Sequence, residues 1–455
     1  METRFNWSGK QVLVLGLARS GVAVARQLHR LGARVTVNDK KPREQAPEAA
    51  ELEQLGVRVV CGGHPAGLVH KKLDLIVKNP GIPYRIAPIQ EAMQKHIPIV
   101  TEVEIAYALS RGSFIGITGS NGKTTTTTLV GEMLKAGGIR NVVAGNIGRA
   151  LTEVASDTDE QEWLVAELSS FQLKGTIRFR PCVAALLNIV PAHLDYHETM
   201  EDYMASKKKL FANQTADDIA IFNADCEKSR QLASEVKATV HMFSRLQQVN
   251  RGADLRSGYI CYHNQDRDSE RILPVEEVAL PGQHNLENAL AAAAIAKACG
   301  CSTAAVAETL RRFSGVEHRL EFVRALDGVR YYNDSKATNP TAMTRTLEAF
   351  NEPIILIAGG LDRGIDFRDL VSVFRERLYG LVVYGQTQGI LKQRGLDAGV
   401  PLIREAEDLE EAVRLASEIA RQHDIVILSP GCASWDQYTS FEERGGIFKQ
   451  AVHRL

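Results

Sequence analysis

The stretch that decides the fold is residues 114–125, which read Phe114-Ile115-Gly116-Ile117-Thr118-Gly119-Ser120-Asn121-Gly122-Lys123-Thr124-Thr125. A short apolar run passes into a glycine-containing turn, a lysine and then threonines that open a helical segment. This order predicts a phosphate-binding loop between a strand and a helix. Gly119 and Gly122 let backbone N–H groups approach phosphate oxygens, Lys123 can reach the β- and γ-phosphates, and Thr124 can bind Mg²⁺.

The loop departs from the usual Gly-x-x-x-x-Gly-Lys-Ser/Thr pattern, because Ile117 stands at the first glycine position. The alternative interpretation is a glycine turn followed by a helix with an exposed lysine. The strand signal directly before Gly-Lys-Thr favours nucleotide binding, and the helix would point its positive end at the anion. The residues predicted to contact the nucleotide here are Gly119, Ser120, Asn121, Gly122, Lys123, Thr124 and Thr125.

The bulk composition is that of an ordinary globular protein. The chain has 455 residues, which suggests about three domains, and 44% of its residues are hydrophobic and 24% charged. The net charge of −1 gives no argument for a nucleic-acid or membrane surface. Residues 1–10 lack the apolar core of a signal peptide, and the most apolar run, 289–296, is too short to span a bilayer. Seven scattered cysteines without a Cys-x-x-Cys pair fit a reducing cytosol and no zinc site. We therefore expect a soluble cytoplasmic protein.

The first hundred residues have the outline of a dinucleotide-binding βαβ unit. A strand at 11–16 is followed by a glycine turn, an amphipathic helix through residue 31, and a strand at 34–37 that ends before Asp39. The fingerprint is incomplete, because Ala18 and Arg19 replace the middle glycine. It favours a Rossmann-like module for a nucleotide-like anion and only weakly NAD. The loop at 78–82 follows a second strand, where open α/β sheets place ligands, although a plain turn is equally compatible with its sequence.

Three polar residues follow apolar strands in the middle of the chain. Asn146 lies between two glycines after a strand that begins at Val142, and Glu167 ends the strand that begins at Trp163. The latter is the position from which an acid holds Mg²⁺ in phosphate-loop enzymes. His193 follows the strand 183–190. An isolated histidine is more often packed or at the surface, but its place beside a predicted Mg²⁺ site favours a ligand role.

Two helical segments carry further candidates. The helix 200–211 contains three consecutive lysines, 207–209, which on composition alone indicate a solvated face. The helix that opens after Gly282 presents Asn285 and Asn288 on one face, where they could read a base edge.

The last third of the chain repeats the pattern of strands that end in polar and glycine-containing loops. Strands are expected at 329–332, 353–358, 381–384 and 425–428. Loops at the carboxyl ends of parallel strands meet in one crevice. This crevice would offer two cations, two hydroxyls and an aromatic ring, a combination that suits a small acidic ligand. The residues concerned are Lys336, Arg363, Thr338, Ser434 and Phe441.

Together these motifs closely resemble those of the Mur ligases, the ATP-dependent amino-acid ligases of peptidoglycan assembly. The resemblance covers essentially the whole chain and is carried by residues 118–124, 145–148, 167–171, 193–197, 282–285 and 318–319. It implies an α/β protein of three domains. These are an N-terminal Rossmann-like domain for the UDP-sugar (1–101), a central phosphate-loop ATPase-like domain with a parallel sheet (102–315), and a C-terminal Rossmann-like domain for the amino acid (316–455).

Within the family, residues 333–339 and 429–434 look like those of the member that adds D-glutamate. The resemblance implies an ADP-forming ligase that joins D-glutamate to UDP-N-acetylmuramoyl-L-alanine through an acyl phosphate. Both steps gather negative charge, so they call for metal ions, lysines and helix N-termini rather than a covalent nucleophile. The choice of D- over L-glutamate rests on the resemblance alone.

The family's site residues are carried over by motif. The catalytic set is Lys123, Asn146, Glu167, His193 and Lys207, and the ligands of two Mg²⁺ ions are Thr124, Glu167, His193 and Lys207. The remaining contacts to ATP are assigned to Asn285, Asn288, Arg319 and Asp334. The UDP-sugar is assigned to Ser20, Asp39, Lys40, Asn79 and Gly81, and D-glutamate to Lys336, Thr338, Arg363, Ser434 and Phe441, with Arg363 where some members have lysine.

Lys207 enters through the family's Tyr-x-x-Ala-Lys motif, whose lysine reacts with CO₂ to form a carbamate that behaves as a carboxylate. The matching stretch is Tyr203-Met204-Ala205-Ser206-Lys207, with Ser206 in place of alanine. Lys208 is the alternative if the register is shifted by one residue, and we choose Lys207.

Three other interpretations are weighed against this one. Another ADP-forming ligase, such as a folylpolyglutamate synthase or a different Mur enzyme, is disfavoured by residues 333–339. A nicotinamide-dependent dehydrogenase would leave the phosphate loop unexplained, and a phosphate-loop kinase or noncatalytic regulator would not need Glu167, His193 and Lys207 together. We further expect a monomer that binds no nucleic acid, and a third module that closes on ATP about hinges near residue 102 and Gly315.

Overall fold

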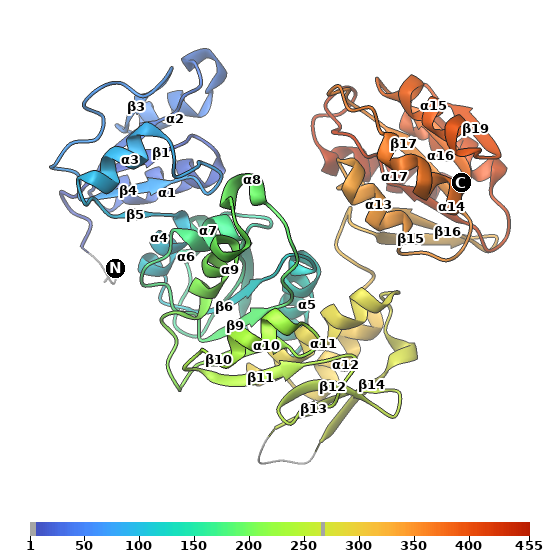
Figure 1. Cartoon of the computed structure of the whole chain (residues 1–455), viewed down its shortest axis with the longest axis horizontal. Helices are drawn as coiled ribbons and strands as arrows, with labels where there is room; N and C mark the ends of the chain where they lie inside the picture. Colours follow the sequence, from blue (N-terminus) through green and yellow to red (C-terminus); the bar gives the residue numbers. More distant parts are fainter. Residues whose placement is uncertain (1–5, 265–268) are drawn as a thin grey trace. The chain divides into compact units, whose positions relative to one another are not determined.

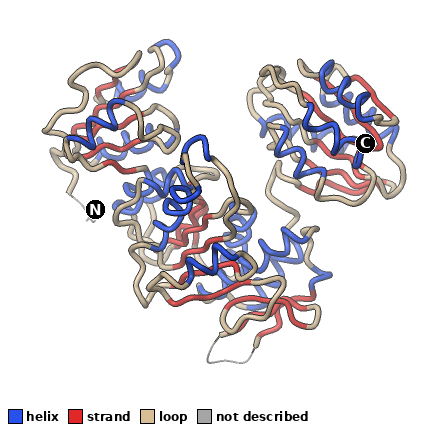
Figure 2. Tube along the Cα trace, in the orientation of Figure 1, coloured by secondary structure: helices blue, strands red, loops and turns tan. Residues whose placement is uncertain are grey.

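The computed structural model describes residues 6–264 and 269–455, apart from the side chain of Asp195. The chain divides into two compact units, Met1–Arg312 and Phe313–Leu455. The first unit contains two β-sheets and the second contains one, and helices cover each sheet (Figures 1 and 2). The expected three-part α/β architecture is confirmed, while the domain boundaries at 101 and 315 stay predictions.

The N-terminal sheet is parallel, with strand order β3-β2-β1-β4-β5. Val12 and Val14 of β1 face a cluster that includes Leu28, while Leu13 and Leu15 face a second cluster on the other side. Such a doubly covered strand must be apolar throughout. The chain order reverses between β1 and β4, so the loops after these strands flank the position where open α/β sheets bind ligands. The elements are β1 (Gln11–Leu15), α1 (Arg19–Arg30), β2 (Arg34–Asn38), η1 (Arg43–Gln45), α2 (Glu48–Gln54), β3 (Arg58–Val60), β4 (Leu75–Lys78), α3 (Ala87–Gln94) and β5 (Ile99–Val100).

The central sheet has nine strands in the order β14-β13-β12-β11-β10-β9-β6-β8-β7. Strands β6 to β12 are parallel, as expected, whereas β13 and β14 extend the sheet in antiparallel fashion. The strands are β6 (Ser113–Thr118), β7 (Asn141–Gly145), β8 (Trp163–Glu167), β9 (Val183–Leu186), β10 (Ile219–Asn223), β11 (Thr239–Phe243), β12 (Gly252–Arg256), β13 (Tyr259–His263) and β14 (Glu270–Pro274).

Helices cover the central sheet, and α5 packs against α11 and α12. A single hydrophobic cluster runs from Val14 and Leu28 of the N-terminal part to Phe114 and Leu164 of the central part, so the first unit has a continuous core. The helices are α4 (Glu102–Leu109), α5 (Lys123–Ala136), α6 (Leu151–Ala155), α7 (Ser170–Lys174), α8 (Leu194–His197), α9 (Met200–Lys208), η2 (Lys209–Phe211), α10 (Glu227–Ala233), η3 (Val275–Glu277), α11 (Gln283–Ala298) and α12 (Thr303–Arg312).

The sheet of the second unit has the order β15-β16-β20-β17-β18-β19, and only β15 pairs in antiparallel fashion. Leu356 of β17 faces a cluster with Phe374 of α14, and Ile357 faces one with Phe448 of α17. The elements are β15 (Glu321–Leu326), β16 (Val329–Asn333), α13 (Pro340–Leu347), β17 (Ile354–Gly359), η4 (Arg368–Leu370), α14 (Val371–Arg377), β18 (Leu378–Tyr384), α15 (Gln388–Ala398), β19 (Leu402–Glu405), α16 (Leu409–Ile419), β20 (Ile425–Leu428) and α17 (Phe441–Arg454).

None of the helices in the described part of the chain is both long and apolar enough to span a lipid bilayer.

Candidate active site around the phosphate loop

The phosphate loop connects β6 to α5, and its two central glycines are required by their surroundings. Gly122 precedes α5 with φ +80°, and a Cβ there would lie 2.2 Å from Oδ1 of Asn288. A Cβ on Gly119 would lie 2.9 Å from Cβ of Leu187. A side chain at either position would therefore displace a neighbouring segment. The loop leaves backbone N–H groups at the start of a helix, which is an anion-binding arrangement.

Two lysines converge on the carbonyl oxygen of Gly119. Lys123 Nζ donates to it at 2.9 Å and to Ser120 O at 3.1 Å. Lys207 Nζ donates to the same Gly119 oxygen at 2.9 Å and lies 3.3 Å from Thr118 Oγ1. Burial, together with the charge of Lys123, holds the pKa of Lys207 well below its usual range. Both lysines therefore lie at the loop, as the sequence predicted.

Lys208, the alternative to Lys207, lies elsewhere. Its side chain is exposed and forms an ion pair with Glu235. The two neighbours on α9 therefore differ in burial and in partners, and only Lys207 reaches the phosphate loop.

Glu167 and Asn146 are also brought together next to this loop, at the ends of the paired strands β8 and β7. Asn146 Nδ2 donates to Glu167 Oε1 at 2.8 Å, and the Asn146 amide donates to the Glu167 carbonyl at 2.9 Å. The second carboxylate oxygen, Oε2, is buried and has no hydrogen-bond partner among the described residues. Burying such an oxygen unpaired is unfavourable, and a bound cation would satisfy it. The position therefore fits a Mg²⁺ ligand.

The other predicted metal ligand, His193, precedes α8 with φ 57° and is exposed. Its ring lies with its centroid 4.9 Å from that of Phe171 in an edge-to-face arrangement. Among the residues that the structure describes, no three His, Cys, Asp or Glu side chains form a metal-binding group.

Asn285 and Asn288 of α11 are buried beside the phosphate loop. Asn288 Oδ1 lies 3.4 Å from Thr126 Oγ1, and Asn288 Nδ2 lies 3.4 Å from Asn285 Oδ1. Asn285 Nδ2 in turn donates to Pro281 O at 2.7 Å. The structure thus gives these residues a role in supporting Gly122 and α5. Their contact with the base stays a prediction.

The N-terminal candidates gather around the loop after β1. Ser20 Oγ donates to Asn79 Oδ1 at 2.8 Å, which joins the start of α1 to the loop after β4. Asp39 accepts hydrogen bonds from the amides of Leu17 and Lys41, so part of its hydrogen-bonding capacity is used within the protein. Lys40 and Gly81 are exposed.

In the second unit, the loops after β16, β17 and β20 follow adjacent strands. Lys336 Nζ lies 5.7 Å from the ring centre of Phe441, and the Arg363 guanidinium lies 4.9 Å from that of Trp435. Ser434 is buried, and Thr338 is partly exposed. Lys336 and Phe441 therefore lie together, and Arg363 lies on Trp435, which was not predicted although it directly follows Ser434.

Asp334 and Arg319, the residues of the second unit assigned to ATP, differ in exposure. The Asp334 carboxylate is buried, accepts hydrogen bonds from Thr346, Ser429 and the Leu320 amide, and has its pKa raised by burial to about 6. It therefore organises the loop after β16 from within. Arg319 is partly exposed, and contacts of either residue with ATP stay predictions.

Comparison with known proteins accounts for this arrangement. Three domain models match in succession: the MurD-like N-terminal domain of Mur ligases over residues 10–101, the Mur ligase middle domain over 117–296, and the glutamate ligase domain of Mur ligases over 318–432. The chain belongs to the Mur ligase family.

Curated relatives of this Mur ligase match it from end to end. A protein of Geobacillus kaustophilus named UDP-N-acetylmuramoylalanine--D-glutamate ligase is 52% identical over 454 residues, which is 100% of this chain and 99% of the relative. A Bacillus cereus protein of the same name is 48% identical over 455 residues and 100% of both chains.

Solved structures share the fold at much lower identity. UDP-N-acetylmuramate-alanine ligase MurC from Thermotoga maritima is 18% identical, with a TM-score of 0.57 over 98% of this chain and 99% of that one. The MurF ligase from Thermotoga maritima, solved in complex with ADP, is 16% identical, with a TM-score of 0.54 over 98% of this chain and 96% of that one.

The structure of this Mur ligase also reveals two residues that sequence reasoning missed. Asn188, two residues after β9, accepts from the amide of Asn121 at 2.9 Å through Oδ1 and donates to its carbonyl at 3.2 Å through Nδ2. The Tyr203 hydroxyl lies 2.8 Å from Ser120 Oγ. Both residues therefore hold the phosphate loop through side-chain hydrogen bonds. The position of Asn188 just beyond a strand end was the only signal in the sequence.

Proposed function

We propose that this Mur ligase joins D-glutamate to UDP-N-acetylmuramoyl-L-alanine in an ATP-dependent, ADP-forming reaction of peptidoglycan precursor synthesis. The observation that carries the proposal is the full-length match, at 52% identity, to a relative named for this reaction. The phosphate loop, with Lys123 and Lys207 at one carbonyl and Glu167 nearby, supplies the chemistry that the reaction requires.

The reaction has two chemical steps. The alanyl carboxylate attacks the γ-phosphorus of ATP, ADP leaves, and an acyl phosphate forms. The amine of D-glutamate then attacks the acyl carbon, and inorganic phosphate leaves from the tetrahedral intermediate as the amide forms. Lys123 and the N-terminus of α5 stabilise the charge on the transferring phosphoryl group. No covalent bond to the protein is needed.

We assign two Mg²⁺ ions to this site. Thr124 and the unpaired Glu167 Oε2 would hold the first ion, while His193 and a carbamate on Lys207 would hold the second. When bound, Mg²⁺ neutralises negative charge on the phosphoryl oxygens. Asn146 fixes Glu167 through Oε1 and so leaves Oε2 for the ion.

A carbamate on Lys207 is supported by its surroundings. The amine is buried, is bonded to neutral oxygens of Thr118 and Gly119, and faces the cation of Lys123, which would pair with a negative carbamate. An unmodified ammonium could not bind Mg²⁺, since it has no lone pair.

The substrates are assigned to the two remaining loop clusters. We place the UDP-sugar at Ser20, Asp39, Lys40, Asn79 and Gly81, and D-glutamate at Lys336, Thr338, Arg363, Ser434 and Phe441. ATP would contact residues 119–125, Asn285 and Asn288, and would receive Arg319 and Asp334 from the second unit. The domain boundaries at 101 and 315, the monomeric state and the cytoplasmic location complete the proposal.

The test is phosphate release from ATP in the presence of Mg²⁺ and UDP-N-acetylmuramoyl-L-alanine, with D-glutamate, L-glutamate, L-lysine or L-alanine added in turn. Release with D-glutamate alone is the expected result. Release with another amino acid would overturn the assignment of the amino-acid pocket, and release with none would overturn the ligase activity itself.

A further inference from the structure

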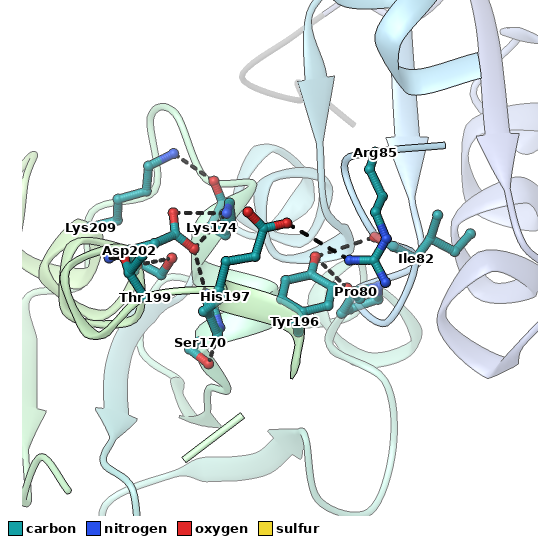
Figure 3. A network of polar contacts seen from close by, with 12 residues as sticks. Pro80, Ile82, Arg85, Ser170, Lys174, Tyr196, His197, Thr199, Asp202 and Lys209 are labelled. Atoms are coloured by element: carbon teal, nitrogen blue, oxygen red, sulfur yellow. Dashed lines mark hydrogen bonds and ion pairs between the residues drawn. The ribbon is translucent and has the colours of Figure 1, made fainter. Parts of the chain in front are cut away.

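A buried polar network joins the loop after β4 to helices α7, α8 and α9, and the proposed catalytic mechanism does not use it (Figure 3). Lys78, the last residue of β4, is only 1% exposed. Its Nζ donates to Pro80 O at 3.0 Å, to the Tyr196 hydroxyl at 3.1 Å and to Asn79 O at 3.3 Å. These acceptors are all neutral, so the buried cation is costly to keep, and burial with the nearby Lys174 lowers the pKa of Lys78 to about 7.

The Tyr196 hydroxyl also binds the backbone of this loop. It lies 3.1 Å from Pro80 O and 3.3 Å from Ile82 O, to which it donates, as Figure 3 shows. Lys78 and Tyr196 therefore fix the backbone of residues 79–82, which contains two of the residues assigned to the UDP-sugar.

The Tyr196 ring also packs on an aromatic side chain that contacts His193, the proposed Mg²⁺ ligand. Its ring packs edge-to-face on Phe171 with centroids 4.5 Å apart, and the same Phe171 ring contacts His193 at 4.9 Å. One aromatic side chain thus touches both the residue that holds the substrate loop and the proposed Mg²⁺ ligand.

Helix α8, which carries Tyr196, is only one turn long and is fixed by its last residue. His197 is buried, with Nδ1 at 2.7 Å from Asp202 and Nε2 at 2.9 Å from Ser170 Oγ. Asp202 also pairs with Lys174 at 2.6 Å. These contacts tie α8, and with it Tyr196, to α7 and α9 (Figure 3).

We propose that Tyr196, together with Lys78, is a positioning residue that couples the UDP-sugar loop to His193. The coupling deepens the proposed function and rests on it. Tyr196 acts through the backbone of Pro80 on one side and the ring of Phe171 on the other, and it does not touch the reacting atoms. The positions of the UDP-sugar loop and of His193 therefore both depend on Tyr196.

The experiment compares Tyr196→Phe with Tyr84→Phe. Tyr84 lies in the same cluster, with its ring centre 4.8 Å from Lys78 Nζ, but the hydrogen bonds described for the 79–82 backbone do not involve its hydroxyl. We expect Tyr196→Phe to raise the KM for UDP-N-acetylmuramoyl-L-alanine by about 5- to 10-fold, because the 79–82 backbone loses the hydrogen bonds that the Tyr196 hydroxyl donates to it. The Mg²⁺ concentration for half-maximal velocity should also rise at least about 2-fold, and Tyr84→Phe should change neither quantity.

Two further variants separate coupling from general stability. Arg85→Ala removes the exposed ion pair with Glu198, another link between the same two regions, and should leave both quantities unchanged. Lys78→Met should raise the same KM, and its effect should be less than additive with Tyr196→Phe, because both residues hold one loop. If Tyr196→Phe does not fold, Lys78→Met tests the contact alone.

The possible results of these measurements distinguish the positioning role, the coupling to His193 and the proposed function. A KM that stays at the wild-type value in Tyr196→Phe overturns the positioning role, and a raised KM with an unchanged Mg²⁺ requirement overturns the coupling to His193. A wild-type enzyme that releases no phosphate with D-glutamate overturns the proposed function instead. In that case binding of UDP-N-acetylmuramoyl-L-alanine by calorimetry still tests the loop, because a dissociation constant equal in wild type and Tyr196→Phe contradicts the positioning role.

Discussion

At the residue scale, the site is built from charged groups that water would otherwise solvate. The Glu167 carboxylate, the Lys207 amine and the Lys78 amine are almost wholly buried. Such groups are expensive in a folded protein unless they are paired or neutral. Their retention at strand ends and around the phosphate loop indicates that they serve chemistry or positioning rather than stability.

Replacing Lys207 by alanine tests its assignment against that of Lys208. We expect Lys207→Ala to lower the rate of phosphate release by about two orders of magnitude or more, because one Mg²⁺ would lose a ligand. Lys208→Ala should stay within about 2-fold of wild type, since it removes only an exposed ion pair. With ¹³C-labelled bicarbonate, a carbamate NMR signal should be present in Lys208→Ala and absent from Lys207→Ala. Equal losses in the two variants would contradict the assignment.

Lys78 should make stability depend on pH in the alkaline range. Its pKa is lowered from 10.5 to about 7, so the folded state gives up a proton that the unfolded chain keeps between these values. The loss of stability caused by burying the Lys78 ammonium is therefore greatest below pH 7 and decreases as the pH rises. Burial raises the pKa values of the neighbouring Tyr84 and Tyr196 hydroxyls, so these two groups do not titrate in the same range.

The measurement is the melting temperature of wild type and Lys78→Met at pH 7 and pH 9.5. Relative to Lys78→Met, the wild type should gain on the order of 3 kcal/mol in unfolding free energy between pH 7 and pH 9.5. A difference that does not change with pH would show that Lys78 is not a buried titrating amine.

At the scale of elements, the loop between β6 and α5 depends on packing against α11. Gly122→Ala combines a strained φ of +80° with a clash at Asn288, whereas Gly138→Ala, at the other end of α5, has φ +71° and open space around its Cβ. Both variants should lose about 1 kcal/mol of stability from backbone strain. Only Gly122→Ala should raise the KM for ATP, by about 10-fold or more. Equal KM values would mean that the loop tolerates a side chain at residue 122.

The same elements show what could be predicted from the sequence. The strand at 425–428 matches β20, and the end of β8 at Glu167 was correctly placed, because apolar runs and glycine turns are local signals. The strand predicted at 183–190 ends at Leu186, since Asn188 turns to hydrogen-bond the phosphate loop. The hairpin of β12 and β13 was not predicted, and neither was α8.

The site was only partly predictable for a physical reason. A polar residue at the end of an apolar strand indicates a place at the ligand-binding edge of a sheet. It does not indicate which strands are neighbours in that sheet. The pairing of β6 with both β8 and β9 brings Glu167 and Asn188 to the same loop. The inward-facing carboxylate of Asp334 and the contact between Lys78 and Tyr196 likewise depend on tertiary packing.

At the scale of the whole molecule, the division into two compact units falls within a few residues of Gly315. This glycine has φ +118°, a conformation that other residues adopt with strain. Units joined by a short link of this kind commonly move relative to one another. The proposed closure of the second unit on ATP would bend the chain at this link.

Small-angle scattering tests this closure. The radius of gyration should fall when a non-hydrolysable ATP analogue, Mg²⁺ and UDP-N-acetylmuramoyl-L-alanine are added together, and change less with the UDP-sugar alone. An unchanged radius under all conditions would remove the hinge near Gly315 from the mechanism.

In the proposed mechanism, the alanyl carboxylate is phosphorylated before D-glutamate attacks. The most direct measurement uses UDP-N-acetylmuramoyl-L-alanine labelled with ¹⁸O in that carboxylate and analyses the inorganic phosphate by mass spectrometry. An acyl phosphate transfers one carboxylate oxygen to phosphorus, so the released phosphate should carry one ¹⁸O atom for each ligation. Phosphate without the label, formed while D-glutamate is being joined, would contradict the mechanism.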